Sequence, residues 1–393
     1  MLIQNVRLIR ELSTGRGAER GAVLVEDGKI AAVYAQLPAG YEGETYDGKG
    51  MTLLPGLIDA HTHLAGLRGY SSAKLRNPMK FFTETCFAAQ RYLDYGFTTV
   101  RDCGVPLRVD IAVRDAIEAG LLAGPRVLAC GLILSPTEIP EDDEISDMYA
   151  WVDNAEDARR AARKELAEQA DFVKVMASGS ALHKHGIPVQ PIITEEEMRA
   201  IVEAAALKDS YVGAHAHGDG AIRLCVDTGV RTIEHASYIS EDTVRAALSR
   251  EDCWLIPTVS AMYQNPATTS EAYMYLVKKL QSMLETSSGC LKTAYEMGAR
   301  MGFGTDSCPG MDQYEQGIEF RLRKECCGMN NIDILLQATK NNAQALGIEE
   351  LTGQIKEGLC ADLILVDGNP DEDITVMYHK PAAVFARGVK IRG

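Results

Sequence analysis

Two histidines separated by one residue, His61 and His63, end an apolar run of this chain. Residues i and i+2 of a β-strand point to the same face, so both imidazoles can bind one cation if the strand stays extended through them. A His-x-His pair can equally be a chance pair of polar residues at a strand end. The pair predicts a metal site only if other ligands join it.

Other apolar runs also end in side chains suited to such a site. These side chains are Lys174, His215, His235 and Asp306. Imidazole and carboxylate ligands without a thiolate favour zinc or a similar divalent ion in a catalytic site. Each residue has an ordinary alternative: a satisfied polar histidine, a snorkelling lysine, a helix-capping aspartate. Because all these alternatives would have to hold together on one face, we predict a metal centre.

Strand-like and helical stretches alternate over residues 53–352, which is typical of a parallel sheet with crossover helices. Eight apolar runs can be counted, of which the first ends at His61 and His63 and the others end at Asp102, Gly131, Lys174, His215, His235, Pro257 and Asp306. The pattern predicts an α/β fold, a (β/α)8 TIM barrel, whose catalytic residues lie at the carboxyl ends of the strands. An open doubly wound sheet would show a Gly-x-Gly-x-x-Gly after the first strand, and none is present there.

Several short motifs predict where strands turn and where helices begin and end. Asp27-Gly28 predicts a tight hairpin, Thr194 and Glu197 predict a capping box, and glycines at 96, 120, 229 and 298 mark helix ends. Residues 1–52 and 353–393 both read as short strands. Since isolated hairpins are not stable alone, we predict that the two ends build one small β-sandwich domain beside the barrel.

Composition limits the partners. The 393 residues carry 40 basic and 55 acidic side chains, a net charge of −15, which disfavours nucleic acid and anionic membranes and favours a small molecule. The amino terminus lacks the pattern of a signal peptide, and no apolar run reaches the roughly 20 residues of a membrane span. The ten cysteines are scattered without a Cys-x-x-Cys pair, so we expect a cytoplasmic enzyme with reduced thiols. The sequence leaves a homo-oligomer open.

The order of these motifs resembles the amidohydrolase superfamily. The resemblance rests on Pro55-Gly56-Leu57-Ile58-Asp59-Ala60-His61-Thr62-His63, then the lysine, two single histidines and the aspartate in the expected order. It covers nearly the whole chain. The segments around Lys174 (Val173–Ser180), His215 (Gly213–Gly218) and His235 (Thr232–Ser237) are most similar to the prolidase-like dipeptidase branch, which is related to imidazolonepropionases.

The resemblance implies two divalent metal ions, with zinc as the first choice, and a carbamate formed from carbon dioxide on Lys174. An ammonium has no acceptor atom and cannot ligate a cation, whereas a carbamate has two oxygens. The implied layout places His61, His63 and Asp306 on the first ion, His215 and His235 on the second, and Lys174 on both. The implied reaction is attack of a metal-bridging hydroxide on an amide, with Asp306 carrying the proton.

The run His215-Ala216-His217 offers two imidazoles on one face for a single ligand position. His215 is assigned as the ligand because the spacing to His235 fits the resemblance. His217 then becomes a candidate contact to substrate and the alternative catalytic residue to Asp306.

Substrate recognition departs from the resemblance. Dipeptidases of this branch commonly carry a Gly-Gly-His after strand three and a tyrosine after the strand-five ligand, and this chain has Ser135–Pro140 and Asp219 there. The change favours a neutral or cationic substrate group over an anion. The predicted substrate contacts lie in the loops after strands three, four and seven, at Glu138, His183, His185 and Tyr263.

Three functions compete. The first is a binuclear metal hydrolase of a dipeptide or N-acyl amino acid. The second is a cyclic-amide or imidazolone-type hydrolase or a deaminase, although the retained Lys174 and the absence of a glutamate just after His215 disfavour deamination. The third is an inactive scaffold that binds partners, which the complete ligand set disfavours.

Overall fold

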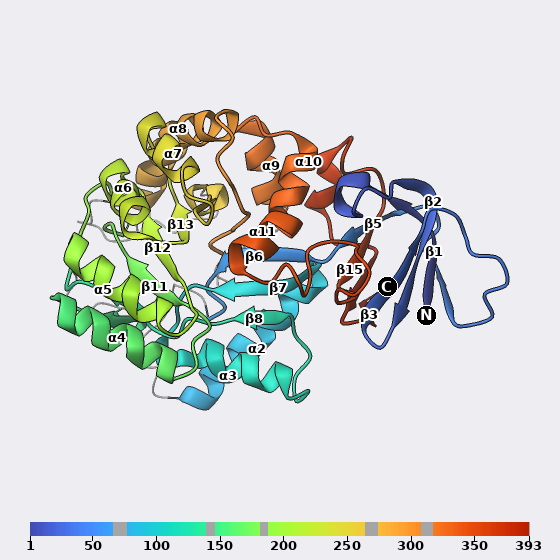
Figure 1. The fold of residues 1–393 in the computed structure, drawn as a ribbon, viewed down its shortest axis with the longest axis horizontal. Helices are drawn as coiled ribbons and strands as arrows, with labels where there is room; N and C mark the ends of the chain where they lie inside the picture. Colours follow the sequence, from blue (N-terminus) through green and yellow to red (C-terminus); the bar gives the residue numbers. More distant parts are fainter. Residues whose placement is uncertain (66–76, 139–145, 181–187, 264–273, 308–316, 393) are drawn as a thin grey trace.

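The computed structural model of the chain describes residues 1–65, 77–138, 146–180, 188–263, 274–307 and 317–392. Figure 1 shows an α/β unit in which strands alternate with helices, and beside it a β-sheet that holds both chain ends. The predicted substrate contacts His183 and His185 lie outside the described residues. In the part of the chain that is described, no helix combines the length and the apolarity that crossing a membrane requires.

Parallel strands form the inner layer of the α/β unit. One sheet has three strands, β6 (Leu57–Thr62), β7 (Phe97–Asp102) and β8 (Arg126–Leu128), and a second has six in the order β10-β9-β11-β12-β13-β14. The bounds of the second sheet are β9 (Ile133–Ser135), β10 (Tyr149–Trp151), β11 (Val173–Met176), β12 (Val212–Ala216), β13 (Thr232–His235) and β14 (Trp254–Ile256). Almost every residue of these strands is buried, as expected for parallel strands covered by helices.

Helices follow the strands along the chain and cover the outside of this layer (Figure 1). They are α2 (Pro78–Asp94), α3 (Val109–Glu118), α4 (Ala155–Ala167), α5 (Glu195–Ala206), α6 (Asp219–Thr228), α7 (Glu241–Leu248), α8 (Met274–Glu296), α9 (Ile318–Glu325), α10 (Asn331–Leu336) and α11 (Asn342–Leu346). The capping box of Thr194 and Glu197 is confirmed at the start of α5. The glycines at 96, 120, 229 and 298 all have the positive φ of helix-ending residues.

The final helical segment contains one turn that the sequence does not predict. Between α10 and α11, residues Gln337–Asn341 form a π-helix, and the segment ends at Gly347 with φ 71°. A π-turn inserts one extra residue into the helix and changes which side chains face inward. Here Asn342 follows directly and points into the core.

The segment Met301–Ser307 lies between the two sheets. Leu255 of β14 exchanges backbone hydrogen bonds with Arg300 and Gly302, and Ala60 of β6 donates to the Phe303 carbonyl at 2.9 Å. The sequence predicts a regular strand here, but the structure has only isolated bridges at Met301 and Ser307. Asp306 adopts φ 54°, which interrupts the extended backbone at that point.

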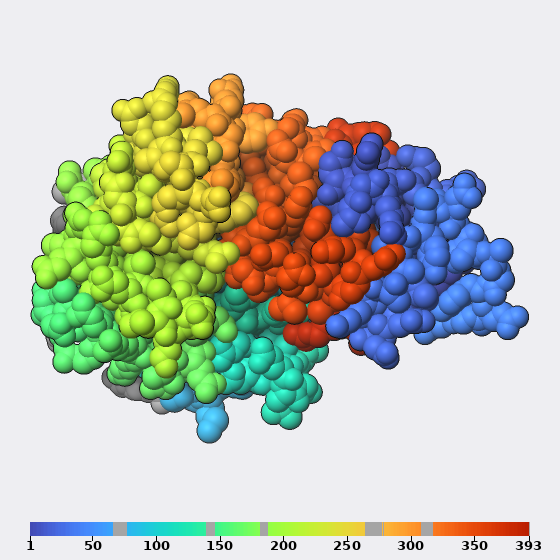
Figure 2. Space-filling model, viewed as in Figure 1, coloured from blue at the N-terminus to red at the C-terminus, as the bar shows by residue number. Residues whose placement is uncertain are grey.

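Strands from both ends of the chain share one sheet, in the order β17-β16-β15-β5-β1-β2-β3, with β4 paired to β1. The strands are β1 (Leu2–Leu8), β2 (Ala18–Glu26), β3 (Lys29–Tyr34), β4 (Thr45–Asp47), β5 (Thr52–Pro55), β15 (Leu363–Val366), β16 (Ala383–Ala386) and β17 (Val389–Arg392). The sequence predicts one small β-sandwich domain built from both ends, and in the structure β5 pairs with both β1 and β15, so strands from the two ends are hydrogen-bonded into one sheet. In Figure 2 the blue amino-terminal residues lie directly against the red carboxyl-terminal ones.

Two hairpins of this sheet turn on residues with positive φ. Asp27 (49°) and Gly28 (75°) form the predicted turn between β2 and β3. Arg387 (50°) and Gly388 (78°) form another, between β16 and β17, which the sequence pattern does not predict. The second turn was missed because an arginine is an unusual first residue for a turn that needs two positive φ angles.

Asn342 ties the segment Met301–Ser307 to β6, and its loss should destabilise the protein. Its Nδ2 donates to the carbonyls of Ile58 and Phe303, both at 2.7 Å, and its Oδ1 accepts from the Phe303 N–H at 2.9 Å. Asn342→Ala removes a hydrogen-bond partner from each of these buried backbone groups. Each buried polar group left without its partner lowers the free energy of unfolding by about 1 to 3 kcal/mol. We expect a loss of about 3 kcal/mol in the free energy of unfolding, measured by urea denaturation.

The neighbouring Asn341→Ala is the matched control. Its side chain makes one hydrogen bond, to the Met301 carbonyl at 3.1 Å, from a half-buried position. Its loss should cost about 1 kcal/mol or less. Equal losses in the two variants would contradict the role given to Asn342.

Candidate metal centre

One cavity of about 80 Å³ lies at the carboxyl ends of the parallel strands. It is lined by all seven residues to which the sequence assigns metal or proton chemistry, together with an apolar wall. The seven residues are His61, His63, Lys174, His215, His217, His235 and Asp306. Strand ends from distant parts of the chain therefore meet at one point, as the barrel prediction requires.

The first group of side chains comprises His61, His63 and Asp306. Asp306 Oδ1 lies 3.4 Å from His61 Nε2 and 3.4 Å from His63 Nε2. Ligands bound at about 2.0 to 2.1 Å around a tetrahedral ion are separated by roughly 3.3 to 3.4 Å. The spacing of these three donors therefore fits a zinc-sized cation.

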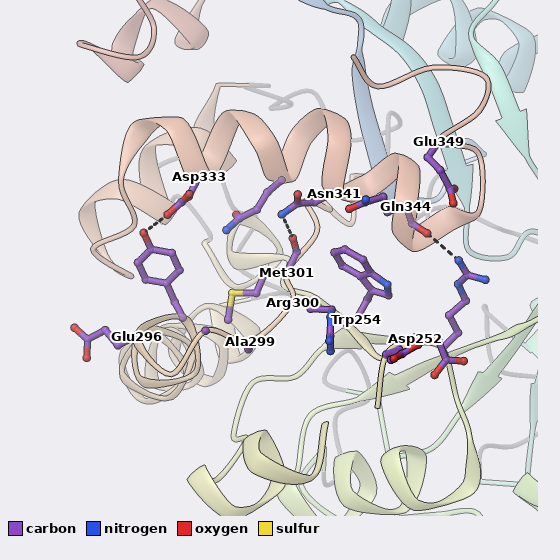
Figure 3. A pocket seen from close by; sticks show the side chains of 15 residues that line it. Asp252, Trp254, Glu296, Ala299, Arg300, Met301, Asp333, Asn341, Gln344 and Glu349 are labelled. Carbon is purple, nitrogen blue, oxygen red and sulfur yellow. Dashed lines mark hydrogen bonds between the residues drawn. The ribbon is translucent and has the colours of Figure 1, made fainter. Parts of the chain in front are cut away.

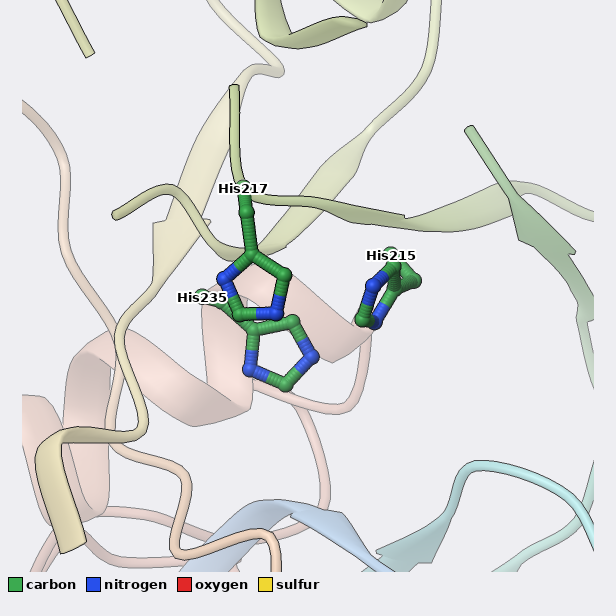
Figure 4. Close-up of side chains that lie close together, drawn as sticks. All are labelled: His215, His217 and His235. Carbon is green, nitrogen blue, oxygen red and sulfur yellow. The ribbon is translucent and has the colours of Figure 1, made fainter. Parts of the chain in front are cut away.

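The second group comprises His215, His217 and His235, whose candidate ligand atoms lie within 4.8 Å of one another. Figure 4 shows the three rings gathered together, with His217 over His235. The ring centroids of that pair are 4.6 Å apart, and the two ring planes are nearly parallel. Ligand atoms of His61, His235 and Asp306 also lie within 4.8 Å of one another, so the two groups are continuous.

The outward-facing ring nitrogens of four histidines have fixed partners. In each of them Nδ1 lies 2.6 to 2.9 Å from an oxygen atom of the protein. The partner of His61 is Glu234, that of His63 is the Gly104 carbonyl, that of His217 is Ser237 and that of His235 is Thr258. Such partners leave Nε2 available as a ligand atom and hold the ring orientation. In His215 the two ring nitrogens exchange these roles. Its Nε2 lies 3.4 Å from the Gly179 carbonyl, so Nδ1 is the nitrogen available as a ligand atom.

Lys174 is the buried amine of the site. Although the sequence places it at a strand end, it is the second residue of β11, and its long side chain reaches the cavity from there. It is 2% exposed, and among the described residues its Nζ has no hydrogen-bond partner. Burying an ammonium without a partner is costly. A carbamate on this nitrogen, held by two cations, would remove that cost, so the residue fits the predicted modification.

Electrostatics favour neutral imidazoles in the second group. Burial lowers the pKa of His217 to about 4, and burial together with neighbouring positive charge lowers the pKa values of His215 and His235 well below their ordinary range. Neutral imidazoles are the form that binds metal. Burial alone would raise the pKa of Asp306, but His61 and His63 hold it well below its ordinary value, so this carboxylate stays ionised.

The backbone is strained at two of these residues. His235 has φ 66°, the following Ala236 has φ 50°, and Asp306 has φ 54°. Non-glycine residues in this region cost of order 1 to 3 kcal/mol each and concentrate at functional sites. With these backbone angles, the side chains of His235 and Asp306 line the cavity. The sequence contains no pattern that predicts the positive φ angles.

Sequence reasoning missed the ion pair of Arg101 and Glu234. Arg101 Nη2 donates to Glu234 Oε1 at 2.7 Å, with both side chains fully buried inside parallel strands. A signal was available, because charged residues inside a buried strand require a partner. The strand Phe97–Asp102 contains the buried charged residues Arg101 and Asp102, and the strand Thr232–His235 contains Glu234.

The apolar wall of the cavity was also missed. It consists of Ile133, Met148, Met176, Ala261, Met262 and Leu280, with Tyr149 beside them. Several come from the loops predicted to carry specificity, but they are not the predicted residues. Glu138 is exposed, and Tyr263 is 37% exposed with Arg321 over its ring. Neither lines the cavity, so the substrate roles of Glu138 and Tyr263 stay predictions.

A larger cavity of about 870 Å³ lies near the opposite ends of the strands, beside α8, α10 and the π-helix (Figure 3). Its lining mixes both charges with the indole of Trp254, and it contains none of the predicted site residues. Its arginines are already committed: Arg231 donates to the carbonyls of Gln344 and Ala345, and Arg300 donates to the Arg250 carbonyl. The chemistry therefore belongs to the smaller cavity.

Comparisons with known proteins agree with this geometry. The model of the amidohydrolase family matches residues 52–391. The chain is 30% identical to ochratoxinase from Aspergillus niger, covering 93% of this chain and 81% of that protein. It is 26% identical to imidazolonepropionase from Rubrobacter xylanophilus, covering 98% and 93%. A crystal structure of a Xaa-Pro dipeptidase with bound methionine superposes with a TM-score of 0.86 at 28% identity, covering 100% of this chain and 99% of that chain.

Proposed function

Because this chain belongs to the amidohydrolase family and is a hydrolase of carbon–nitrogen bonds, we propose that it cleaves an amide bond in a dipeptide or N-acyl amino acid with the help of two divalent metal ions. The observation that carries the proposal is the convergence of seven predicted residues on one cavity, with Asp306 Oδ1 3.4 Å from two imidazole nitrogens. The TIM-barrel fold follows from the family. We further propose that Met301–Ser307 closes the two parallel sheets into a complete eight-stranded barrel.

The proposed ligands divide as the two groups of side chains do. His61, His63 and Asp306 would hold one ion, His215 and His235 would hold the other, and a carbamate on Lys174 would bind both. Zinc is the first choice for imidazole and carboxylate ligands in a site of this kind. When bound, such a pair of ions polarises the scissile carbonyl and lowers the pKa of the attacking water toward neutrality.

Asp306 is the proposed proton carrier. Its carboxylate stays ionised at neutral pH, so it can accept a proton from the attacking water and donate it to the departing amine nitrogen. An amine is a poor leaving group until it is protonated. The buried imidazoles are less suited to this step, since four of them already use Nδ1 in contacts with the protein. His217 is the alternative carrier.

The apolar wall indicates the kind of substrate group that lies beside the scissile bond. Methionines 148, 176 and 262 are each 5% exposed or less and form a deformable surface with Leu280. Methionine side chains adapt to irregular apolar shapes. The relatives named ochratoxinase and Xaa-Pro dipeptidase support an amide substrate for this chain too. We therefore favour substrates with an apolar or aromatic side chain next to the amide.

A cyclic amide is the second candidate. The specific observation that favours it is the imidazolonepropionase relative, which aligns over 98% of this chain. Opening a lactam ring requires the same attack on an amide carbonyl, so the two candidates differ in the shape of the substrate rather than in the metal centre.

A hydrolysis screen tests the proposal. Protein prepared with zinc and bicarbonate should contain two zinc ions per chain by elemental analysis. Against dipeptides, N-acyl amino acids, lactams and aryl amides, kcat/KM should be highest for a linear amide with an apolar side chain, and removal of metal by a chelator should abolish turnover. Fewer than one ion per chain would contradict the metal centre, and a preference for lactams would favour the second candidate.

A further inference from the structure

A buried chain of charges runs from Arg101 to a proposed ligand. Arg101 Nη2 lies 2.7 Å from Glu234 Oε1, and Glu234 Oε2 lies 2.9 Å from His61 Nδ1. The side chains of Arg101 and Glu234 have no exposed surface, and that of His61 is 2% exposed. One carboxylate therefore uses one oxygen for the guanidinium and the other for the imidazole.

The arginine has no freedom to move away. Its Nε donates to the Ala60 carbonyl at 2.6 Å and its Nη1 donates to Thr232 Oγ1 at 2.9 Å, while the guanidinium lies 4.9 Å from the centroid of the Phe172 ring. Thr232 Oγ1 in turn donates to Glu234 Oε1 at 2.7 Å. Contacts with β6, with β13 and with Phe172, just before β11, thus hold Arg101 and with it the Glu234 carboxylate in one orientation.

We propose that Glu234, held by Arg101, is the positioning residue that makes His61 a ligand. Its carboxylate keeps the imidazole hydrogen on Nδ1, so the lone pair of Nε2 faces Asp306. A carboxylate behind an imidazole ligand also makes that ligand more basic. This inference rests on the proposed metal centre and extends it to a residue that does not touch the ion.

The protein contains a second ion pair that serves as an internal comparison. Arg323 and Glu319 are also fully buried, their closest atoms are also 2.7 Å apart, and Arg323 lies 4.7 Å from the centroid of the Phe303 ring. Glu319 accepts from the backbone N–H groups of Val259 and Ser260, and among the described residues no imidazole donates to it. The two pairs share burial and geometry but differ in what the carboxylate supports.

Zinc affinity separates the two roles. The amide of Glu234→Gln has one oxygen in place of two, so it cannot accept from both Arg101 and His61. In competition with a chromophoric zinc chelator, we expect this variant to bind the zinc ion held by His61 about 10- to 100-fold less tightly than wild type does. Glu319→Gln should lose stability in the absence of metal but bind zinc within about threefold of wild type. The zinc-induced rise in Tm should shrink in the first variant only.

Thr232→Val provides a milder variant in case Glu234→Gln does not fold. It removes the hydroxyl that holds Glu234 and Arg101 but keeps both charges, and it should weaken zinc binding by a smaller factor in the same direction. Wild-type affinity in both variants, or equal losses in Glu234→Gln and Glu319→Gln, would overturn the positioning role while leaving the metal centre intact. A wild-type protein that binds no zinc would contradict the proposed function as well.

Discussion

Lys174→Ala is expected to lose most hydrolytic activity, by about three orders of magnitude or more, together with at least one of two metal ions. The lysine is the only proposed ligand shared by both ions, so its removal should affect both groups of imidazoles. Without it, the site has one negative ligand fewer, and cations held mainly by imidazole donors bind less tightly. Elemental analysis and kcat on the best substrate of the screen measure the two effects.

Chemical rescue makes this prediction specific. The alanine variant leaves space where the carbamate would lie, so acetate or propionate at millimolar concentration should restore part of the activity and of the metal content. Lys174→Met fills the same space with an apolar chain of similar length and should not respond. Because Lys174 belongs to the buried strand β11, circular dichroism should be measured to verify that both variants are folded. Full activity in metal-replete Lys174→Ala would exclude the bridging role.

Asp306→Asn should retain the fold and at least one metal ion but reduce kcat by about 10²- to 10⁴-fold, the range typical of a lost general acid or base. The asparagine keeps the shape of the side chain and an oxygen toward His61 and His63, but it cannot accept a proton. The wild-type carboxylate has a pKa held well below its ordinary value. The activity of the wild type should therefore not fall from protonation of Asp306 until the pH drops far below neutrality.

The test compares kcat at matched metal content, because a loss of metal would mimic a loss of proton transfer. Turnover equal to wild type in metal-replete Asp306→Asn would reject the proton-carrying role. His217→Asn would then be examined as the alternative, since its imidazole lies beside His235 in the same cavity.

The sequence could predict where the chemical side chains meet, because strand periodicity and the common direction of parallel strands bring their carboxyl ends together. His61, His63, His215 and His235 follow from that rule alone. The inner surface of the cavity could not be predicted in the same way. Met148 and Met262 reach it from short 3-10 helices in the connections after β9 and β14, whose positions depend on tertiary contacts rather than on local pattern.

The pairing of Arg101 with Glu234 and the backbone angles of His235 and Asp306 could not be predicted from local sequence, for different reasons. Arg101 and Glu234 are charged residues in separate strands, and only the packed sheets reveal that they form a pair. Positive φ angles are uncommon for any residue other than glycine, even for Asp and His, which adopt them more often than most, so the sequence does not predict them at His235 and Asp306. Such strain persists only because the surrounding structure holds it.

The sheet shared by the two ends of the chain can be completed only late in translation. Strand β5 pairs with β15, which emerges from the ribosome about 300 residues later. At about 5 to 20 residues per second, that interval lasts roughly 15 to 60 s. Throughout it, one edge of β5, with the apolar Leu53 and Leu54, has no partner strand, and unpaired apolar edges invite association between chains. We therefore expect shielding of this edge to limit such association until β15 has been translated.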